Sequence, residues 1–348
     1  MRLLVTGHEG YVGSVLVPML REAGHEVTGL DTGWFNDCGF PPRPDERAPA
    51  QVPTLRVDVR DVTYDHCAGF DAVLHLAALS DDPLGNLNPS VTYDVNYHAA
   101  VRLARAAKTA GVPRFLFAST CVMYGAGSDD WIDERVSFAP VTPYGESKVL
   151  AERRIASLAD DDFSPVFLRH TTAYGASPML RGDLLINNLV AFAVATGNVL
   201  LHGDADSWRP LIHVADIARS YLAILSTGRD VWHGRAYHVG RSDENHRIAD
   251  LVHMVCDEVP GAKIEFDDGP HLDSRSYRVS CDRISREIPM FRPRWTVQEG
   301  IKELTAAYQA EDLRLAEFED RYLRIRRIRR LVADGVLDLR LRPATEMP

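Results

Sequence analysis

Tyr144 and Lys148 form the clearest pair of side chains suited to acid–base chemistry. They are four residues apart in Tyr144-Gly145-Glu146-Ser147-Lys148, so on a helix they share one face. A neighbouring ammonium group favours the ionised phenol, and we expect Tyr144 to exchange a proton near neutral pH. Lys148 is also placed to bind the ribose of a nucleotide.

Two hydroxyl groups lie upstream of this pair. Ser119 and Thr120 directly follow the apolar run 114–118, which predicts a buried strand. Active-site groups gather at the carboxyl ends of parallel strands, so a hydroxyl there can hold a substrate oxygen beside Tyr144. The alternative is that both hydroxyls only bond the backbone of a turn.

A glycine-rich turn, Thr6-Gly7-His8-Glu9-Gly10-Tyr11-Val12-Gly13, stands near the start of the chain. It separates the apolar run 2–5 from the stretch 12–20, which predicts a helix, and this is the context of a dinucleotide fingerprint. Gly7 allows the sharp turn, Gly10 leaves room for a pyrophosphate, and Gly13 lets the helix pack closely. The helix N-terminus offers N–H groups to the phosphates. An ordinary strand-to-helix turn is the alternative.

Asp31 ends the next predicted strand, 26–31, eighteen residues after Gly13. That is close to the spacing of roughly 20 expected for a carboxylate that binds the adenosine ribose. Asp31 would repel a 2′-phosphate, and no Arg follows it directly, so we expect NAD rather than NADP. The alternative is a turn residue at the strand end.

Apolar runs that predict strands alternate with helical patterns over the first half of the chain. The predicted strands are 55–58, 72–76, 114–118 and 166–168, and the predicted helices are 88–111 and 144–158. This alternation indicates an α/β fold, a Rossmann doubly wound parallel sheet, with a smaller C-terminal α/β substrate domain. We expect residues 1–170 to form the dinucleotide-binding domain, with 211–242 returning to it, and 171–210 and 243–310 to form the substrate domain.

Composition favours an ordinary globular enzyme. Of the 348 residues 45% are hydrophobic and 25% charged, and the net charge of −10 argues against nucleic acid as a partner. No apolar run reaches the ~18 residues that a membrane span needs. The five cysteines are scattered and the thirteen histidines lack metal-ligand spacing, so we expect no metal and a reducing, cytoplasmic location.

These motifs resemble the extended short-chain dehydrogenase/reductase family, the NAD-dependent sugar-nucleotide epimerases and dehydratases. The resemblance covers roughly residues 1–310 and implies NAD as cofactor, a nucleotide-sugar substrate and a homodimer. It is carried by the glycine turn, Asp31, 58–61 (DVRD), 75–78 (HLAA), Asn96, Ser119-Thr120, Tyr144/Lys148, 168–175, Asn187-Asn188 and 209–216 (RPLIHVAD).

The resemblance also implies a role for individual residues. Thr120, Tyr144 and Lys148 take the catalytic positions. The cofactor positions are Gly7, Gly10, Tyr11, Val12, Asp31, Asp58, Val59, Leu76, Ala77, Ala78, Asn96, Ser119, Tyr144 and Lys148, with Asp58 and Val59 flanking the adenine. The substrate positions are Ser80, Thr120, Val122, His170, Thr172, Asn188, Arg209 and Arg275, with Asn188 and Arg209 on the diphosphate side. For Arg275 a solvated surface charge is the alternative.

The chain departs from the family pattern at the residues after Thr120. Dehydratases carry Asp-Glu there as acid and base, whereas this chain has Cys121 and Val122, and Val122 cannot move a proton. We interpret Cys121 as a buried small residue rather than a catalytic thiol. Thr172 replaces the usual Asn. His170 replaces a commonly aromatic residue and is either a proton-transfer group or a packed or substrate-bonding histidine.

The C-terminal extension, residues 311–348, lies outside the resemblance. Phe318, Tyr322, Ile325, Ile328 and Val332 recur at helical spacing, with Glu317/Arg321 and Asp320/Arg324 as i,i+4 pairs. We predict an amphipathic helix that packs on its own subunit or on a partner, with nucleic-acid or membrane binding as the alternative.

The function predicted from these residues is an NAD-dependent nucleotide-sugar epimerase that oxidises the sugar transiently at C4 and reduces it again. The alternatives are a nucleotide-sugar dehydrogenase or ketoreductase, or a dehydratase that uses His170. A catalytically inactive NAD-binding protein is the contrasting class, and the intact set Thr120, Tyr144 and Lys148 argues against it.

Overall fold

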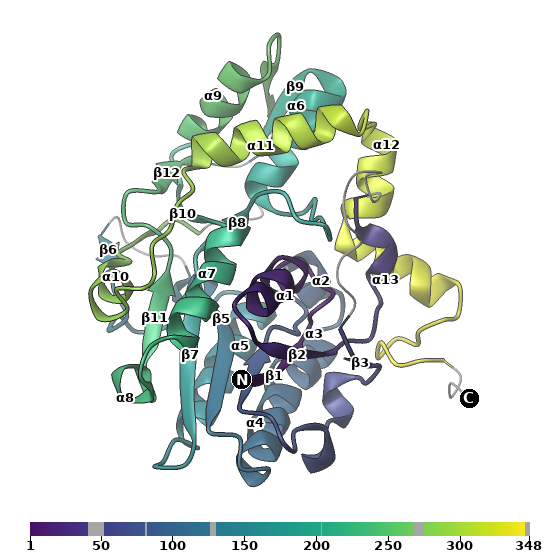
Figure 1. The fold of residues 1–348 in the computed structure, drawn as a ribbon. Helices are drawn as coiled ribbons and strands as arrows, with labels where there is room; N and C mark the ends of the chain where they lie inside the picture. The colour runs from purple at the N-terminus through teal and green to yellow at the C-terminus, as the bar shows by residue number, and fades with distance from the viewer. Residues whose placement is uncertain (41–51, 81, 126–129, 203, 268–274, 345–348) are drawn as a thin grey trace.

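The computed structural model describes residues 1–40, 52–80, 82–125, 130–202, 204–267 and 275–344. Its centre is a parallel sheet of seven strands in the order β11-β7-β5-β4-β1-β2-β3 (Figure 1). The strands are β1 (Arg2–Thr6), β2 (Glu26–Leu30), β3 (Thr54–Leu55), β4 (Ala72–His75), β5 (Arg114–Thr120), β7 (Ser164–His170) and β11 (Ala236–Val239). The predicted doubly wound sheet is confirmed, although the strand predicted at 55–58 ends at Leu55.

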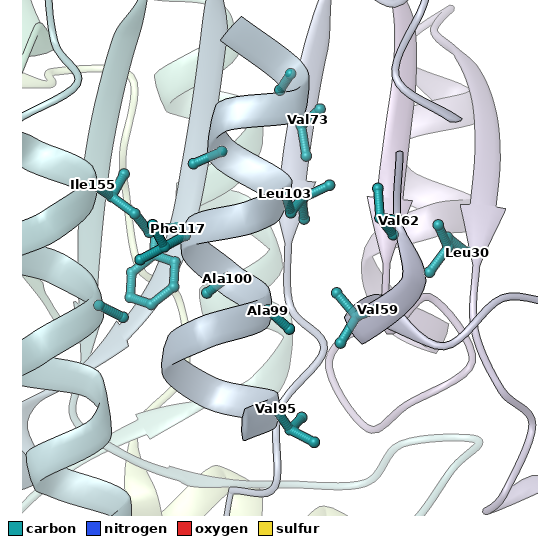
Figure 2. Packing of buried hydrophobic residues seen from close by; sticks show 14 of the residues in the cluster. Leu30, Val59, Val62, Val73, Val95, Ala99, Ala100, Leu103, Phe117 and Ile155 are labelled. Atoms are coloured by element: carbon teal, nitrogen blue, oxygen red, sulfur yellow. The ribbon is translucent and has the colours of Figure 1, made fainter. Parts of the chain in front are cut away.

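Helices cover both faces of this sheet, because successive side chains of each strand point to opposite faces. Leu4 packs in one core with α5 and the long helical run before β5, whereas Leu3 and Val5 pack in the other with α1 and α7. Figure 2 shows the first of these cores. The covering helices are α1 (Gly13–Glu22), α3 (Pro89–Tyr93), α4 (Ala100–Thr109), α5 (Pro143–Ala156), α7 (Val214–Leu225) and α8 (Arg229–Trp232).

The helix predicted at 88–111 is not uniform. A π-helical segment, Asp94–Ala99, lies between α3 and α4, so the i→i+4 pattern is interrupted without a break in the helical path. Asn96 lies in this segment and is buried. The apolar periodicity predicted the helix. It did not predict the π-helical segment, because one extra residue in a helical turn leaves no clear signal in that periodicity.

Smaller sheets and further helices stand over the carboxyl ends of the central strands (Figure 1). The strands are β8 (Thr172–Tyr174), β10 (Trp208–His213) and β12 (Asn245–Arg247) in one sheet, and the pairs β9 (Asn198–His202) with β13 (Lys263–Asp267) and β6 (Trp131–Ile132) with β14 (Arg278–Val279). The helices are α2 (Asp82–Leu87), α6 (Leu185–Thr196), α9 (Ile248–Glu258), α10 (Asp282–Glu287) and α11 (Val297–Ala310). In the part of the chain described, no helix is both long and apolar enough to cross a membrane.

The C-terminal extension is helical but is not one helix. α12 (Leu315–Glu317) continues into a π-helical turn, Phe318–Tyr322, and Leu323 is extended before α13 (Arg324–Ala333) begins. The predicted pair Glu317/Arg321 is present at 3.3 Å. The predicted pair Asp320/Arg324 is wrong, because the break at Leu323 turns Arg324 inward, where it is buried, and Asp320 pairs with Arg330 instead.

Candidate active site

A cavity of about 1100 Å³ lies at the carboxyl ends of the central strands. Its walls are the segments that follow β1, β2, β4, β5 and β7, which is where an open α/β sheet binds its ligands. Single drug-sized ligands occupy pockets of about 300–1,000 Å³, so this cavity is large enough for more than one. All but one of the residues predicted for the site line it; the exception is Asn96.

The glycine turn forms the floor of the cavity. Gly7 has a φ of +72°, and a Cβ there would lie 2.7 Å from the backbone nitrogen of Ala77. A Cβ on Gly13 would lie 2.4 Å from the carbonyl oxygen of Gly7. No side chain caps the N-terminus of α1, so its N–H groups remain for an anion. The turn therefore fits a dinucleotide diphosphate.

Asp31 lies at the end of β2 and is held by backbone donors. Its carboxylate accepts hydrogen bonds from the N–H groups of Gly33 at 2.9 Å and Glu9 at 3.1 Å. Burial raises the pKa of Asp31, while these N–H donors oppose that rise. The carboxylate is thus fixed in orientation at the edge of the cavity, as recognition of a ribose diol requires.

Asp58 and Val59 line the same cavity as Asp31. Asp58 accepts hydrogen bonds from the Arg60 guanidinium, the shortest at 2.6 Å, and Arg342 of the C-terminal extension lies 3.5 Å away. The carboxylate predicted to flank the adenine is therefore already in an ion pair, and Arg60 also donates to the carbonyl of Arg340 at 2.7 Å.

Asn96 holds the cavity wall without lining it. Its amide accepts from the N–H of Leu79 at 2.8 Å and donates to the carbonyl of Leu79 at 2.9 Å. Both backbone groups of one residue are thus satisfied by one side chain. Asn96 therefore fixes the segment after β4, in which Leu76, Ala77, Ala78 and Ser80 line the cavity.

Thr120, Tyr144 and Lys148 converge on the cavity from β5 and α5. The Thr120 hydroxyl lies close enough to Tyr144 to favour its ionised form, and Lys148 donates to the carbonyl of Ala118 at 2.9 Å. The predicted lowering of the Tyr144 pKa is not found. Burial raises the pKa of Tyr144 to about 12, and burial lowers that of Lys148 to about 7, so its charge near neutral pH is only partial.

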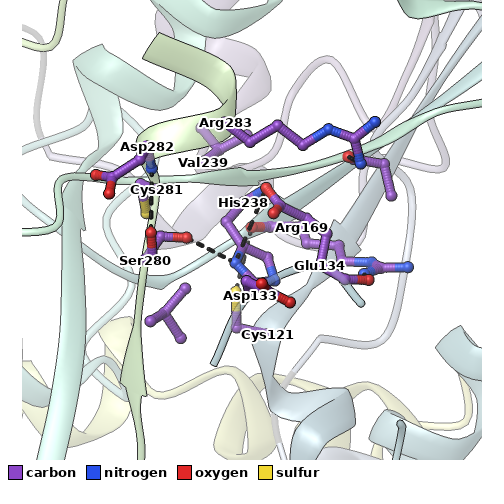
Figure 3. Close-up of polar contacts among 12 residues, drawn as sticks. Cys121, Asp133, Glu134, Arg169, His238, Val239, Ser280, Cys281, Asp282 and Arg283 are labelled. Carbon is purple, nitrogen blue, oxygen red and sulfur yellow. Dashed lines mark hydrogen bonds and ion pairs between the residues drawn. The ribbon is translucent and has the colours of Figure 1, made fainter. Parts of the chain in front are cut away.

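A buried polar network begins at Ser119, the residue before Thr120. Ser119 donates to Glu152 at 2.7 Å, and Glu152 forms an ion pair with Arg169. Arg169 also donates to the Tyr124 hydroxyl at 2.8 Å, and Tyr124 contacts His238 at 2.6 Å. Figure 3 shows the far part of the network, where His238 contacts Ser280 at 2.9 Å beside Glu134 and Arg169.

Cys121 lies next to this network and not in the cavity. It is buried, its thiol donates to the carbonyl of Arg169 at 3.3 Å, and burial raises its pKa well above the usual range. A thiol of this kind is a poor nucleophile. Val122 does line the cavity, so an apolar side chain stands at the position of the dehydratase acid.

His170 and Thr172 also line the cavity. Burial lowers the pKa of His170 to about 3, and its ring lies 3.4 Å from the Tyr221 hydroxyl. A histidine with this pKa is neutral at physiological pH and is a weak base. The environment of His170 therefore favours the packed or substrate-bonding interpretation over proton transfer.

Arg209, Arg275 and Asn188 line another part of the cavity. Arg209 is buried, and its guanidinium donates to the carbonyl of Trp208 at 3.0 Å and to that of Arg275. Arg275 forms a 2.8 Å ion pair with Asp82, so the alternative of a solvated surface charge is wrong. Arg209 and Arg275 contact each other and line one cavity, and two Arg side chains suit a diphosphate.

Residues 3–240, more than half of the length of the chain, match the NAD dependent epimerase/dehydratase family. The chain belongs to this family. It is therefore an NAD-dependent enzyme, and the residues around the glycine turn fit that cofactor.

The relatives of this chain include both epimerases and dehydratases. A UDP-glucose 4-epimerase from Corynebacterium glutamicum is 29% identical, over 83% of this chain and 90% of its own length. The UDP-glucose 4-epimerase of Thermus thermophilus, solved with NAD, is 26% identical, with a TM-score of 0.73 and coverage of 89% and 99%. A dTDP-glucose 4,6-dehydratase from Streptomyces venezuelae, solved with NAD, is 25% identical, with a TM-score of 0.75 and coverage of 89% and 97%.

The cavity also contains charged residues that the sequence analysis did not single out. Arg181 donates to the Ser80 hydroxyl at 2.9 Å and pairs with Asp183. Asp82 contributes a carboxylate near Tyr144, and its Oδ1 is buried with no hydrogen-bond partner among the described residues. Asp82 lies two residues after Ser80, a predicted substrate residue, so its position in the sequence is a signal that could have found it. Arg181 lies in an irregular segment without a periodic or motif signal.

Proposed function

We propose that the protein is an NAD-dependent nucleotide-sugar 4-epimerase. The observation that carries the proposal is the set Thr120, Tyr144 and Lys148 lining one cavity, in which the Thr120 hydroxyl favours the ionised form of Tyr144 and which also contains Arg209 and Arg275. The epimerase relatives are consistent with it.

Tyr144 moves the proton in this proposal. Its phenolate, a minor form at a pKa of about 12, takes the proton of the sugar C4 hydroxyl, and Thr120 holds the same oxygen by a hydrogen bond. When bound, NAD would accept the hydride from C4 and return it to the other face of the ketone. Tyr144 would then give its proton back to the C4 oxygen. The Lys148 ammonium stabilises the Tyr144 phenolate that takes the proton of the C4 hydroxyl.

The residues around Tyr144 suit this reaction because simple 4-epimerisation needs no further acid or base. Val122 cannot move a proton, and His170 is neutral with a pKa of about 3. A second candidate is a dehydratase, which the carboxylate of Asp82 near Tyr144 favours, since elimination of water requires an additional acid or base.

The substrate class that we propose is a nucleoside diphosphate sugar. Arg209 and Arg275 offer charge-assisted hydrogen bonds to its diphosphate, and Asn188 lies in the same cavity. Incubation with UDP-glucose, UDP-glucuronate and their dTDP, GDP, CDP and ADP counterparts tests the function. An isomer of unchanged mass and new retention time supports epimerisation, whereas NADH accumulation with a product lacking two hydrogens contradicts it.

We further propose that residues 1–170 and 211–242 form the cofactor-binding domain and that 171–210 and 243–310 form the substrate domain. In support, β11, within 211–242, is an edge strand of the central sheet. A cytoplasmic location is supported by the five cysteines, all of which are free thiols. A homodimer is supported by the family resemblance, and light scattering of the purified protein tests it.

A further inference from the structure

The C-terminal extension packs against the cofactor side of the central sheet. Ile328 and Leu331 of α13 belong to the same core as Leu4 and Leu30. Arg327 donates to the carbonyl of Trp34 at 3.0 Å and lies 2.7 Å from Asp37. These contacts join α13 to the segment that follows Asp31, and Figure 1 shows the two side by side.

Arg324, the first residue of α13, lines the same cavity as Asp31 and Gly10. Only 4% of this residue is exposed. Its guanidinium stacks over the Phe35 ring, 4.2 Å from the centroid, and Nη2 donates to the carbonyl of Met179 at 3.4 Å. Nη1 is buried and has no hydrogen-bond partner among the described residues. The Cys38 thiol beside it is a weak acceptor.

The charge of Arg324 is poorly compensated. Asp183, the nearby carboxylate, already forms an ion pair with Arg181, which is itself a second positive charge near Arg324. Burial and Arg181 both lower the pKa of Arg324, yet a guanidinium stays protonated in proteins. A buried cation without an anion is costly, so an anionic group of a ligand would relieve a real penalty here.

We propose that Arg324 binds a phosphate oxygen of the nucleotide in this cavity, so that the C-terminal extension completes the cofactor site. The cofactor is the favoured source of the phosphate, because Arg324 stacks on Phe35, four residues after Asp31, and both side chains line the cavity that the glycine turn also lines. The family match ends at residue 240, far before Arg324. The inference rests on the cofactor and not on the proposed sugar reaction, so the two can fail separately.

The test is calorimetry of the NAD-free full chain with NAD, ADP and UDP. Arg324→Met and Arg324→Lys should weaken binding of NAD and ADP by about tenfold to a hundredfold, with Lys losing less than Met, and leave UDP binding unchanged. Arg329→Ala, which removes an exposed charge from the same helix, should change none of the three.

The melting temperature of the ligand-free chain separates binding from structure. Arg324→Met should keep or raise it, because an unpaired buried charge is removed. A fall in melting temperature with unchanged NAD and ADP affinity would overturn the proposal and make Arg324 a structural residue. Weaker UDP binding with unchanged NAD binding would overturn the assignment to the cofactor and place Arg324 on the substrate's phosphates.

Discussion

The Ser119 hydroxyl donates a 2.7 Å hydrogen bond to Glu152, one turn beyond Lys148 on α5. Glu152 also forms a buried ion pair with Arg169 on β7. One carboxylate thus ties α5, which carries Tyr144 and Lys148, to two strand ends, one of which carries Thr120.

Glu152→Gln should therefore destabilise the protein by about 3–5 kcal/mol, because it leaves the Arg169 charge buried without its partner. Urea unfolding measures this. The matched control is Glu146→Gln on the exposed face of the same helix, where a change within about 0.5 kcal/mol is expected. Equal effects of the two variants would show that the buried pair does not support the site.

Tyr144→Phe should reduce turnover by at least ~10², the scale of one general acid or base, and leave NAD binding nearly intact. Steady-state kinetics and calorimetry provide the two readouts. Tyr93→Phe, whose lost hydroxyl bonds Glu146 at the surface, serves as the control. Activity near wild type in the Tyr144 variant would mean that the proton moves elsewhere.

Lys148→Met should stabilise the ligand-free protein by roughly 1–4 kcal/mol at pH 6–7 while abolishing activity, since a buried charge is replaced by an apolar chain. The pKa of Lys148 falls from 10.5 to about 7 on folding. Between these values the unfolded chain holds a proton that the native state has released, so wild-type stability rises with pH.

The advantage of Lys148→Met should consequently be largest at and below pH 7 and shrink toward pH 10. Thermal unfolding across this range checks it, with Lys302→Met, an exposed substitution, as the control. A difference that is constant with pH would contradict a lowered pKa for Lys148.

Arg209→Ala should weaken UDP binding by roughly 1.5–3 kcal/mol and barely change NAD affinity. Because Arg209 also bonds the carbonyls of Trp208 and Arg275, a lower melting temperature is expected as well. Arg286→Ala, at an exposed position outside the cavity, controls for loss of charge. If UDP binds wild type and variant alike, Arg209 is structural or the substrate is not a nucleotide sugar.

Sequence alone predicted the parts of the site that depend on local rules. Gly7 and Asp31 follow strands, Thr120 is the last residue of one, and the ends of parallel strands meet at one edge of a sheet. Tyr144 and Lys148 share a face because they are one helical turn apart. Such relationships need only the order of the elements and the period of a helix.

The other features of the site depend on tertiary contacts and on burial. Asn96 was expected to contact the cofactor, but its amide is used by the backbone of Leu79. The pKa of Tyr144 depends on burial, which motif spacing does not report. Arg324 reaches the cavity only because the helical path breaks at Leu323, and no Gly or Pro marks that break.

The most direct test of the proposed 4-epimerisation follows the hydrogen atom at C4 of the sugar. A nucleotide sugar deuterated at C4, incubated with the enzyme and NAD, should give its C4 epimer with unchanged mass and the deuterium retained, because the same hydride leaves and returns. Mass spectrometry of the separated products measures this. A product lighter by one water would contradict the account, and Asp82 would then be the first residue to test as the missing acid or base.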